Sequence, residues 1–259
     1  TGFLIILMPS SNVHYFGGDK FNRNHPTIVM IHGAGQTSKT WEYQLPVMRE
    51  HPDFNCVILD LPGHGKSAGT GCSSINEYKR FLKSFCDEMD FTNLILVGHS
   101  MGGGIAQLYC IDYPQTVSML VLAATGARLR VAEETLNLVK TDYNRFCEIA
   151  PTRAFAPSSP DTLKDEFRMG LLGTSPQTVL QDLIACDQFD SMDRIGEILA
   201  PTLIIAGDQD MLTPVKYGEY LNNKIEGSTL RVIDDSGHFI MKEKPNEFNE
   251  VIMNFLKSQ

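Results

Sequence analysis

The segment Gly98-His99-Ser100-Met101-Gly102 places a serine between two glycines in the spacing G-x-S-x-G. An apolar run precedes it, and the sequence after it predicts a helix over 102–113. A strand-to-helix turn of this kind tolerates only small neighbours, and it presents the serine hydroxyl at the positive end of the helix. The spacing therefore predicts a nucleophile at Ser100, with the backbone N–H of Met101 facing the position where an oxyanion would form.

A second small-residue loop, Gly33-Ala34-Gly35, follows the apolar run 27–32. A loop after an early strand can donate another backbone N–H to an oxyanion, and flanking glycines let the Ala34 amide face the pocket. We therefore expect Ala34 to pair with Met101 as the two donors. A simple tight turn is the alternative for this segment.

A serine hydroxyl needs a neighbouring base, and the sequence offers seven histidines. His238 follows the last predicted strand, where the chain leaves the sheet at the same carboxyl-end edge as Ser100. We expect His238 to be the base. His32 and His99 adjoin strand-to-loop junctions, and we expect structural hydrogen bonding from both.

The base in turn needs a carboxylate that holds its tautomer and stabilises the imidazolium. The segment Gly207-Asp208-Gln209-Asp210 follows the apolar run 202–206, and either aspartate could serve. Asp234 and Asp235 are too close to His238 along the chain to orient its far nitrogen. The residues by themselves leave Asp208 and Asp210 as alternatives.

The elements that must position these residues alternate between short apolar runs and longer amphipathic stretches, which predicts an α/β fold with a mostly parallel sheet. Val, Ile and Leu dominate the runs, as in strands buried on both faces. Core strands are predicted at 27–32, 54–60, 93–99, 117–124, 201–207 and 229–234, and an antiparallel edge at 3–8 and 13–16. Helices are predicted at 75–89, 102–113, 214–222 and 243–257.

One stretch, 126–196, lacks a convincing strand and predicts several short helices. It is too long for a plain connection in a compact domain, so we expect a helical insertion between two core strands. The predicted organisation is one core domain, formed by 1–125 and 197–259, with the insertion 126–196.

Composition narrows the classes of function. The formal net charge of −9, with no basic run, argues against nucleic acid as a partner. The apolar run 3–8 is too short to span a membrane, so no membrane span is expected. Six cysteines are scattered without a C-x-x-C pair, which favours free thiols and a cytoplasmic location.

Taken together, these motifs resemble the α/β-hydrolase superfamily, and most closely its small, capped branch of esterases and related hydrolases. They occur in order over nearly the whole chain, and the order serine, aspartate, histidine matches the family's arrangement. The matching segments are His32-Gly33-Ala34-Gly35, Asp60-Leu61-Pro62-Gly63-His64-Gly65-Lys66-Ser67, Gly98-His99-Ser100-Met101-Gly102-Gly103, Gly207-x-x-Asp210-x-x-x-Pro214 and Gly237-His238.

The resemblance implies an α/β-hydrolase fold with a mostly parallel central sheet flanked by helices and a helical cap insertion. It selects Asp210 as the acid, because the family uses the carboxylate of G-x-x-D-x-x-x-P. It also implies that 126–196 is a cap over the active site and that 60–67 is a structural loop. Serine at position 100 argues against haloalkane dehalogenases and epoxide hydrolases, whose nucleophile is aspartate.

The expected reaction is two-step acyl transfer on a small-molecule ester with a small or medium apolar acyl group, without a metal or cofactor. Carbon–carbon bond hydrolases, lipases, thioesterases and perhydrolases share this triad, and a non-catalytic ligand receptor is a further alternative. The cap arginines could instead meet a carboxylate or a carrier protein, although a solvated mixed surface is expected there. The cap candidates for substrate contact are Phe146, Phe155, Met169 and Phe189.

Overall fold

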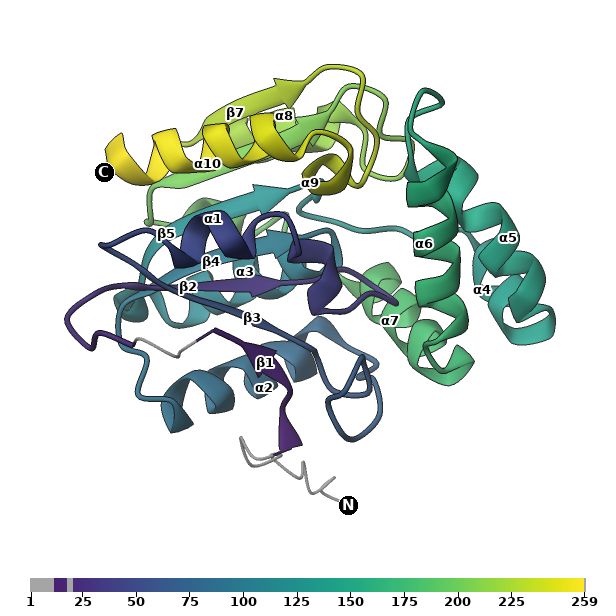
Figure 1. The fold of residues 1–259 in the computed structure, drawn as a ribbon, viewed down its shortest axis with the longest axis horizontal. Coiled ribbons are helices and arrows are strands. Elements are labelled where there is room, and N and C mark those ends of the chain that lie inside the picture. Colours follow the sequence, from purple (N-terminus) through teal and green to yellow (C-terminus); the bar gives the residue numbers. More distant parts are fainter. Residues whose placement is uncertain (1–11, 18–20, 259) are drawn as a thin grey trace.

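The computed structural model describes residues 12–17 and 21–258, in which seven strands form one sheet with helices on both faces (Figure 1). The strand order is β1-β3-β2-β4-β5-β6-β7. β1 pairs antiparallel with β3, and the other neighbouring strands pair in parallel. The strands are β1 (Tyr15–Phe16), β2 (Thr27–Ile31), β3 (Asn55–Leu59), β4 (Leu94–His99), β5 (Val117–Ala123), β6 (Thr202–Gly207) and β7 (Thr229–Ile233).

The predicted core strands are confirmed, each to within one residue at either end, as β2 to β7. The antiparallel edge predicted at 13–16 is β1, whereas the strand predicted at 3–8 lies outside the described residues. The central strands are buried throughout, because alternate side chains enter two different cores. In β2, Ile28 and Met30 belong to one core, and Val29 and Ile31 belong to the other.

Each core is closed by its own set of helices. α2 (Ile75–Glu88), α3 (Met101–Asp112) and α8 (Val215–Lys224) contribute to one core. α1 (Leu45–Arg49), α9 (Ile240–Glu243) and α10 (Pro245–Ser258) contribute to the other. Two short 3-10 turns, η3 (Pro114–Thr116) and η4 (Ile195–Glu197), lead into β5 and β6.

Two local features differ from the sequence predictions. The helix expected over 243–257 is α10, which begins at Pro245, and a separate short helix that was not predicted, α9, ends at Glu243, because the residue before a proline avoids helical dihedral angles. The 3-10 turn η2 (Ser38–Trp41) and the short α1 were not predicted. Trp41 and Met48, which are fully buried, anchor these two elements in the core.

The expected insertion consists of four helices, α4 (Glu133–Thr141), α5 (Tyr143–Ala154), α6 (Asp161–Leu172) and α7 (Pro176–Gln188). They form a group beyond the carboxyl ends of the strands, on the side to which the arrowheads point (Figure 1). We refer to residues 126–196 as the cap. Loops that leave the strands at this edge therefore lie between the sheet and the cap.

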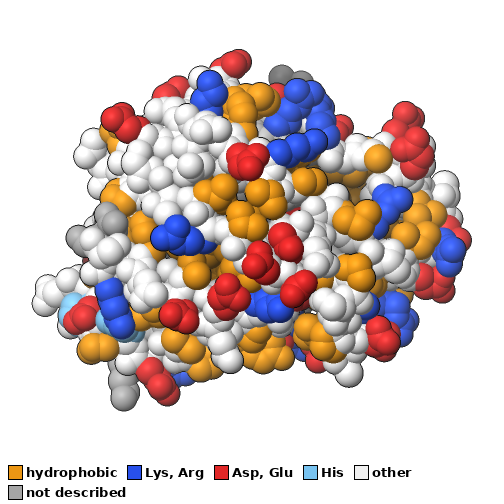
Figure 2. Space-filling model, turned by 90° about the horizontal axis from the view of Figure 1, so that it is seen from above, with side chains coloured by type: hydrophobic (Ala, Val, Ile, Leu, Met, Phe, Trp, Pro, Cys, Tyr) orange, Lys and Arg blue, Asp and Glu red, His pale blue; other side chains and the backbone are white. Residues whose placement is uncertain are grey.

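The surface is mixed in character. On the face shown in Figure 2, acidic, basic and hydrophobic side chains are interspersed, and no continuous basic surface covers that face. All six cysteines lie in the described part of the chain and are free, as predicted. None of the helices described is both long enough and apolar enough to cross a membrane.

Candidate active site

Ser100 lies in the tight turn between β4 and α3, with φ at +53° and ψ at −116°. A positive φ is strained for a residue with a side chain. The two glycines of the motif are required by close approach of the backbone. A Cβ on Gly98 would lie 2.4 Å from the carbonyl oxygen of Gly102, and one on Gly102 would lie 2.3 Å from that of Ile31.

Hydrogen bonds on both sides of Ser100 hold this conformation. Its N–H donates to the carbonyl of Ala123 at 3.0 Å, and its own carbonyl accepts from Gly103 N–H at 2.9 Å. The Thr125 hydroxyl donates to the same carbonyl at 2.7 Å. Met101 is the first residue of α3, a position whose N–H has no acceptor within the helix.

The loop 33–36 lies directly against Ser100. The N–H of Gln36 donates to the carbonyl of Gly33 at 3.2 Å and closes a four-residue turn. Gly35 has φ at +66°, which favours glycine at that position. A Cβ on Gly33 would lie 3.2 Å from Cβ of Ser100. The loop that carries Ala34 is therefore in contact with the turn that carries Ser100 and Met101.

Asp210 and His238, both only 4% exposed, form a hydrogen-bonded pair. His238 Nδ1 lies 2.8 Å from Asp210 Oδ2, which also accepts from the Thr213 hydroxyl at 2.7 Å. Asp210 Oδ1 accepts from the backbone N–H groups of Leu212 at 2.7 Å and Thr213 at 2.9 Å. Every acceptor direction of the carboxylate is thus used, which fixes its orientation toward the imidazole.

The charge of Asp210 follows from these contacts. Burial by itself would raise the pKa of this carboxyl group, but the neighbouring His238 and the hydrogen bonds from Thr213 hold the pKa well below its ordinary value. Asp210 is therefore an ionised acceptor at neutral pH. Nδ1 of His238 must then carry the proton, which leaves Nε2 free to accept one.

The alternative aspartate, Asp208, is exposed and points elsewhere. Its Oδ1 accepts from the backbone N–H of Ser236 at 3.2 Å. The structure therefore brings Asp210, and not Asp208, against His238.

The two other histidines near the site make structural hydrogen bonds. His99 Nε2 donates to the carbonyl of His238 at 3.0 Å, and burial lowers the pKa of His99 well below its ordinary value. His32 Nδ1 donates to the carbonyl of Gly33 at 2.8 Å, and its Nε2 accepts from Leu61 N–H at 3.0 Å. Both rings hold loops of the site in place.

Ser100 and His238 line one cavity of about 420 Å³ between the sheet and the cap. Ala34, Thr213 and Phe239 line it from the core. The cap contributes mainly apolar walls: Leu129, Leu138, Phe146, Ile149, Phe167, Leu171, Val179 and Leu183. A mainly apolar pocket with a few polar groups at one end is typical of small-molecule sites.

Of the four cap candidates for substrate contact, only Phe146 is among the residues that line this cavity. Phe155 stacks on Phe239 with ring centroids 5.0 Å apart and is buried beside the cavity. Phe189 packs on the backbone of Gly104. Met169 is 58% exposed on the outer surface of α6. Helical spacing predicts that such side chains are apolar contacts, but it does not predict which face of each cap helix meets the cavity.

Sequence analysis missed three side chains that hold the site. Thr213 contacts both Asp210 and His238, at 2.7 and 3.2 Å. Glu243 accepts from the N–H groups of Gly237 and Ala156, and thereby ties the His238 loop to the cap. Asp182 of α7 accepts from a backbone N–H of the Ala34 loop. No local pattern marks Asp182, because its partner is 147 residues away in sequence, and none indicates the contact of Glu243 with Ala156, which is 87 residues away.

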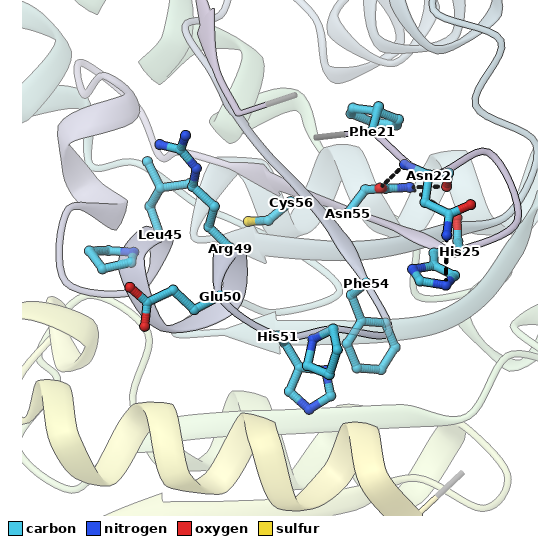
Figure 3. Close-up of a pocket in the computed structure, with 12 residues that line it drawn as sticks. Phe21, Asn22, His25, Leu45, Arg49, Glu50, His51, Phe54, Asn55 and Cys56 are labelled. Atoms are coloured by element: carbon cyan, nitrogen blue, oxygen red, sulfur yellow. Dashed lines mark hydrogen bonds between the residues drawn. The ribbon is translucent and has the colours of Figure 1, made fainter. Parts of the chain in front are cut away.

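A larger cavity of about 780 Å³ lies at the opposite end of the sheet, where β3 begins (Figure 3). Asn55 hydrogen-bonds the backbone of Asn22 at its wall. His25, Glu50 and His51 also line it. Among the described residues, however, no group of three or more His, Cys, Asp or Glu side chains is placed to hold a metal ion. The catalytic candidates all lie at the other edge.

Comparisons with known proteins find similar sequences and similar folds. Residues 28–251 match the profile of the alpha/beta hydrolase family. A 2-hydroxy-6-oxononadienedioate/2-hydroxy-6-oxononatrienedioate hydrolase of Klebsiella pneumoniae is 30% identical, with 89% of this chain and 86% of that protein covered. A thermophilic esterase has a similar structure, with 32% identity, a TM-score of 0.81 and coverage of 95% and 93%. An esterase from Exiguobacterium antarcticum has 25% identity, a TM-score of 0.86 and coverage of 95% and 94%.

Proposed function

Because the chain belongs to the alpha/beta hydrolase family, we propose that it is a serine hydrolase that cleaves carboxylic esters through an acyl-enzyme on Ser100. The observation that supports this most is that Ser100 and His238 line one apolar cavity, with Asp210 hydrogen-bonded to His238 behind it. Ester-cleaving relatives of similar structure support the ester over other acyl compounds.

In the proposed mechanism, His238 acts first as a general base and then as a general acid. His238 Nε2 takes the hydroxyl proton as Ser100 attacks the carbonyl carbon, and Asp210 stabilises the resulting imidazolium. The N–H groups of Ala34 and Met101 donate to the oxyanion of the tetrahedral intermediate. His238 then protonates the leaving alcohol, and a water molecule repeats the sequence to release the acid.

The cavity supports a small or medium apolar acyl group as the substrate class, because its cap walls are mainly aliphatic and aromatic. The chemistry of these residues needs neither a metal nor an organic cofactor. The pocket also suits a small molecule better than a carrier protein.

Labelling with a fluorophosphonate tests the nucleophile. Wild-type protein is expected to react and to hydrolyse p-nitrophenyl butyrate, and Ser100→Ala is expected to do neither. Ser73→Ala, which changes an exposed serine, is the control and should behave as wild type. A folded wild type that neither labels nor hydrolyses esters would instead favour a ligand receptor.

Carbon–carbon bond hydrolysis is a second candidate, because the Klebsiella pneumoniae relative is named for hydrolysis of a dioate. Two cap arginines, Arg130 and Arg153, line the cavity and could meet a carboxylate. Comparing kcat/KM on graded p-nitrophenyl esters with kcat/KM on a vinylogous diketone distinguishes the two reactions. A preference of more than about 10-fold for the diketone would replace the ester proposal.

A further inference from the structure

Asp182, in cap helix α7, is fully buried and directs its carboxylate into the core. Oδ2 accepts from the backbone N–H of Gly35 at 2.8 Å and lies 2.7 Å from Nε2 of His64. Oδ1 accepts from the Tyr78 hydroxyl. All three partners belong to the core domain, so one cap side chain joins three separate core segments.

His64 completes this arrangement as a cation. Its Nδ1 lies 3.0 Å from the carbonyl of Pro62, and its Nε2 faces the Asp182 carboxylate. Both neighbours are acceptors, so only the doubly protonated ring can donate to both. Burial opposes that charge, yet Asp182 raises the pKa of His64 above its ordinary value. The pair is therefore a buried ion pair with its hydrogen bonds satisfied.

Gly35, the partner of Asp182 in the core, meets the cap at its N–H, at its carbonyl and at the position that a Cβ would take. Its N–H donates to Asp182, and its carbonyl oxygen lies 3.4 Å from the Thr174 hydroxyl, whose one proton is shared with the carbonyl of Gly170 at 3.1 Å. A Cβ on Gly35 would lie 2.9 Å from a methyl group of Leu171 and 3.3 Å from one of Val179. All four contacts come from the cap. Gly35 directly follows Ala34, so the same contacts restrict the position of the Ala34 peptide.

We propose that Asp182 is a positioning residue for the oxyanion loop: by holding Gly35, its carboxylate fixes the Ala34 N–H where the oxyanion forms. The proposal rests on the ester hydrolysis proposed above. It predicts that the donor is correctly placed only when the cap is packed on the core. Because a displacement of about 1 Å can cost about 100-fold in rate, the effect of losing this contact should appear in kcat.

Two substitutions test the proposal. Asp182→Ala removes both carboxylate oxygens and is expected to lower kcat about 10- to 100-fold with little change in KM. Asp182→Asn keeps an oxygen that can accept from Gly35 and should lower kcat less. The inhibition constant of a trifluoromethyl ketone, whose adduct with Ser100 carries an oxyanion, should rise in the same order. A purely structural ion pair would not produce that parallel.

Asp165→Ala is the matched control, because Asp165 is an exposed aspartate of cap helix α6 whose ion-pair partner, Arg168, lies on the same helix, and neither residue lines the cavity. It should leave kcat and the inhibition constant unchanged. A folded Asp182→Ala protein with wild-type values for both would overturn the proposal. If that variant does not fold, Asp182→Asn decides, because its uncharged oxygen holds the Gly35 N–H more weakly than the carboxylate does, and wild-type values there would overturn the proposal. A wild type that does not hydrolyse esters refutes the underlying function, and the variants are compared only after that measurement.

Discussion

Replacing Asp210 by asparagine should change the tautomer of His238 without changing the shape of the site. Oδ1 of Asp210 accepts from two backbone N–H groups, those of Leu212 and Thr213. The amide oxygen of the asparagine must occupy that position. Its NH2 group is then placed where Oδ2 was, 2.8 Å from His238 Nδ1. The opposite orientation would direct NH2 at these two donors, at a cost of about 1–3 kcal/mol for the buried N–H of Thr213 left unsatisfied.

An N–H facing Nδ1 requires a lone pair on that nitrogen, so the proton of a neutral His238 moves to Nε2. Nε2 can then no longer accept the Ser100 proton. We therefore expect Asp210→Asn to lower kcat by about 10⁴-fold, which corresponds to about 5 kcal/mol in the activation barrier. KM should change little, because Asp210 does not line the cavity.

The assay is steady-state hydrolysis of p-nitrophenyl butyrate, with circular dichroism to confirm that the variant is folded. Asp208→Asn is the matched control, since it makes the same exchange two residues away on an exposed side chain. It should keep kcat within about 3-fold of wild type, as usual for surface changes. An Asp210→Asn protein that retains more than a tenth of wild-type kcat, or an equal loss in Asp208→Asn, would refute this account of the acid.

Three further predictions follow from the packing. Gly98→Ala should lower the urea midpoint by the equivalent of about 1–3 kcal/mol, because its Cβ would lie 2.4 Å from a backbone oxygen. Gly170→Ala, in a helix with open space around it, should instead raise the midpoint. Equal changes in the midpoint of both variants would contradict this reasoning. Burial and the nearby His64 lower the pKa of His32 from 6.5 to about 4. As the pH decreases, His32 therefore binds a proton in the unfolded chain before it does so in the folded protein, and the free energy of unfolding should fall between about pH 6.5 and about pH 4. His32→Gln should reduce that slope in unfolding free energies measured at several pH values, and an unchanged slope would show that other groups cause it. Phe146→Ala should shift the preference in kcat/KM toward longer p-nitrophenyl esters, whereas the exposed Met169→Ala should not; a shift in both would argue against the cavity as the acyl site.

Features that depend on residues adjacent in the chain could be predicted from the sequence. The strained turn at Ser100 needs glycine two residues before and after it, because a Cβ on Gly98 would lie 2.4 Å from the backbone of the turn itself and one on Gly102 would lie 2.3 Å from the backbone of β2. The core strands were equally predictable, since burial on both faces requires continuous apolar runs. The family resemblance implied Asp210, which is the aspartate that the fold places beside His238.

Tertiary structure decided the features that depend on which distant surfaces meet. Nothing near Asp182 in sequence indicates its contacts with Gly35 and His64, which are 147 and 118 residues away. The cap helices show the same limit, because their apolar side chains pack on each other, on the core or on the cavity with the same helical spacing. Phe146 meets the cavity and Phe189 meets the core, although both looked alike in sequence. Periodicity determines that a helix has a buried face, whereas only the packed fold determines what that face contacts.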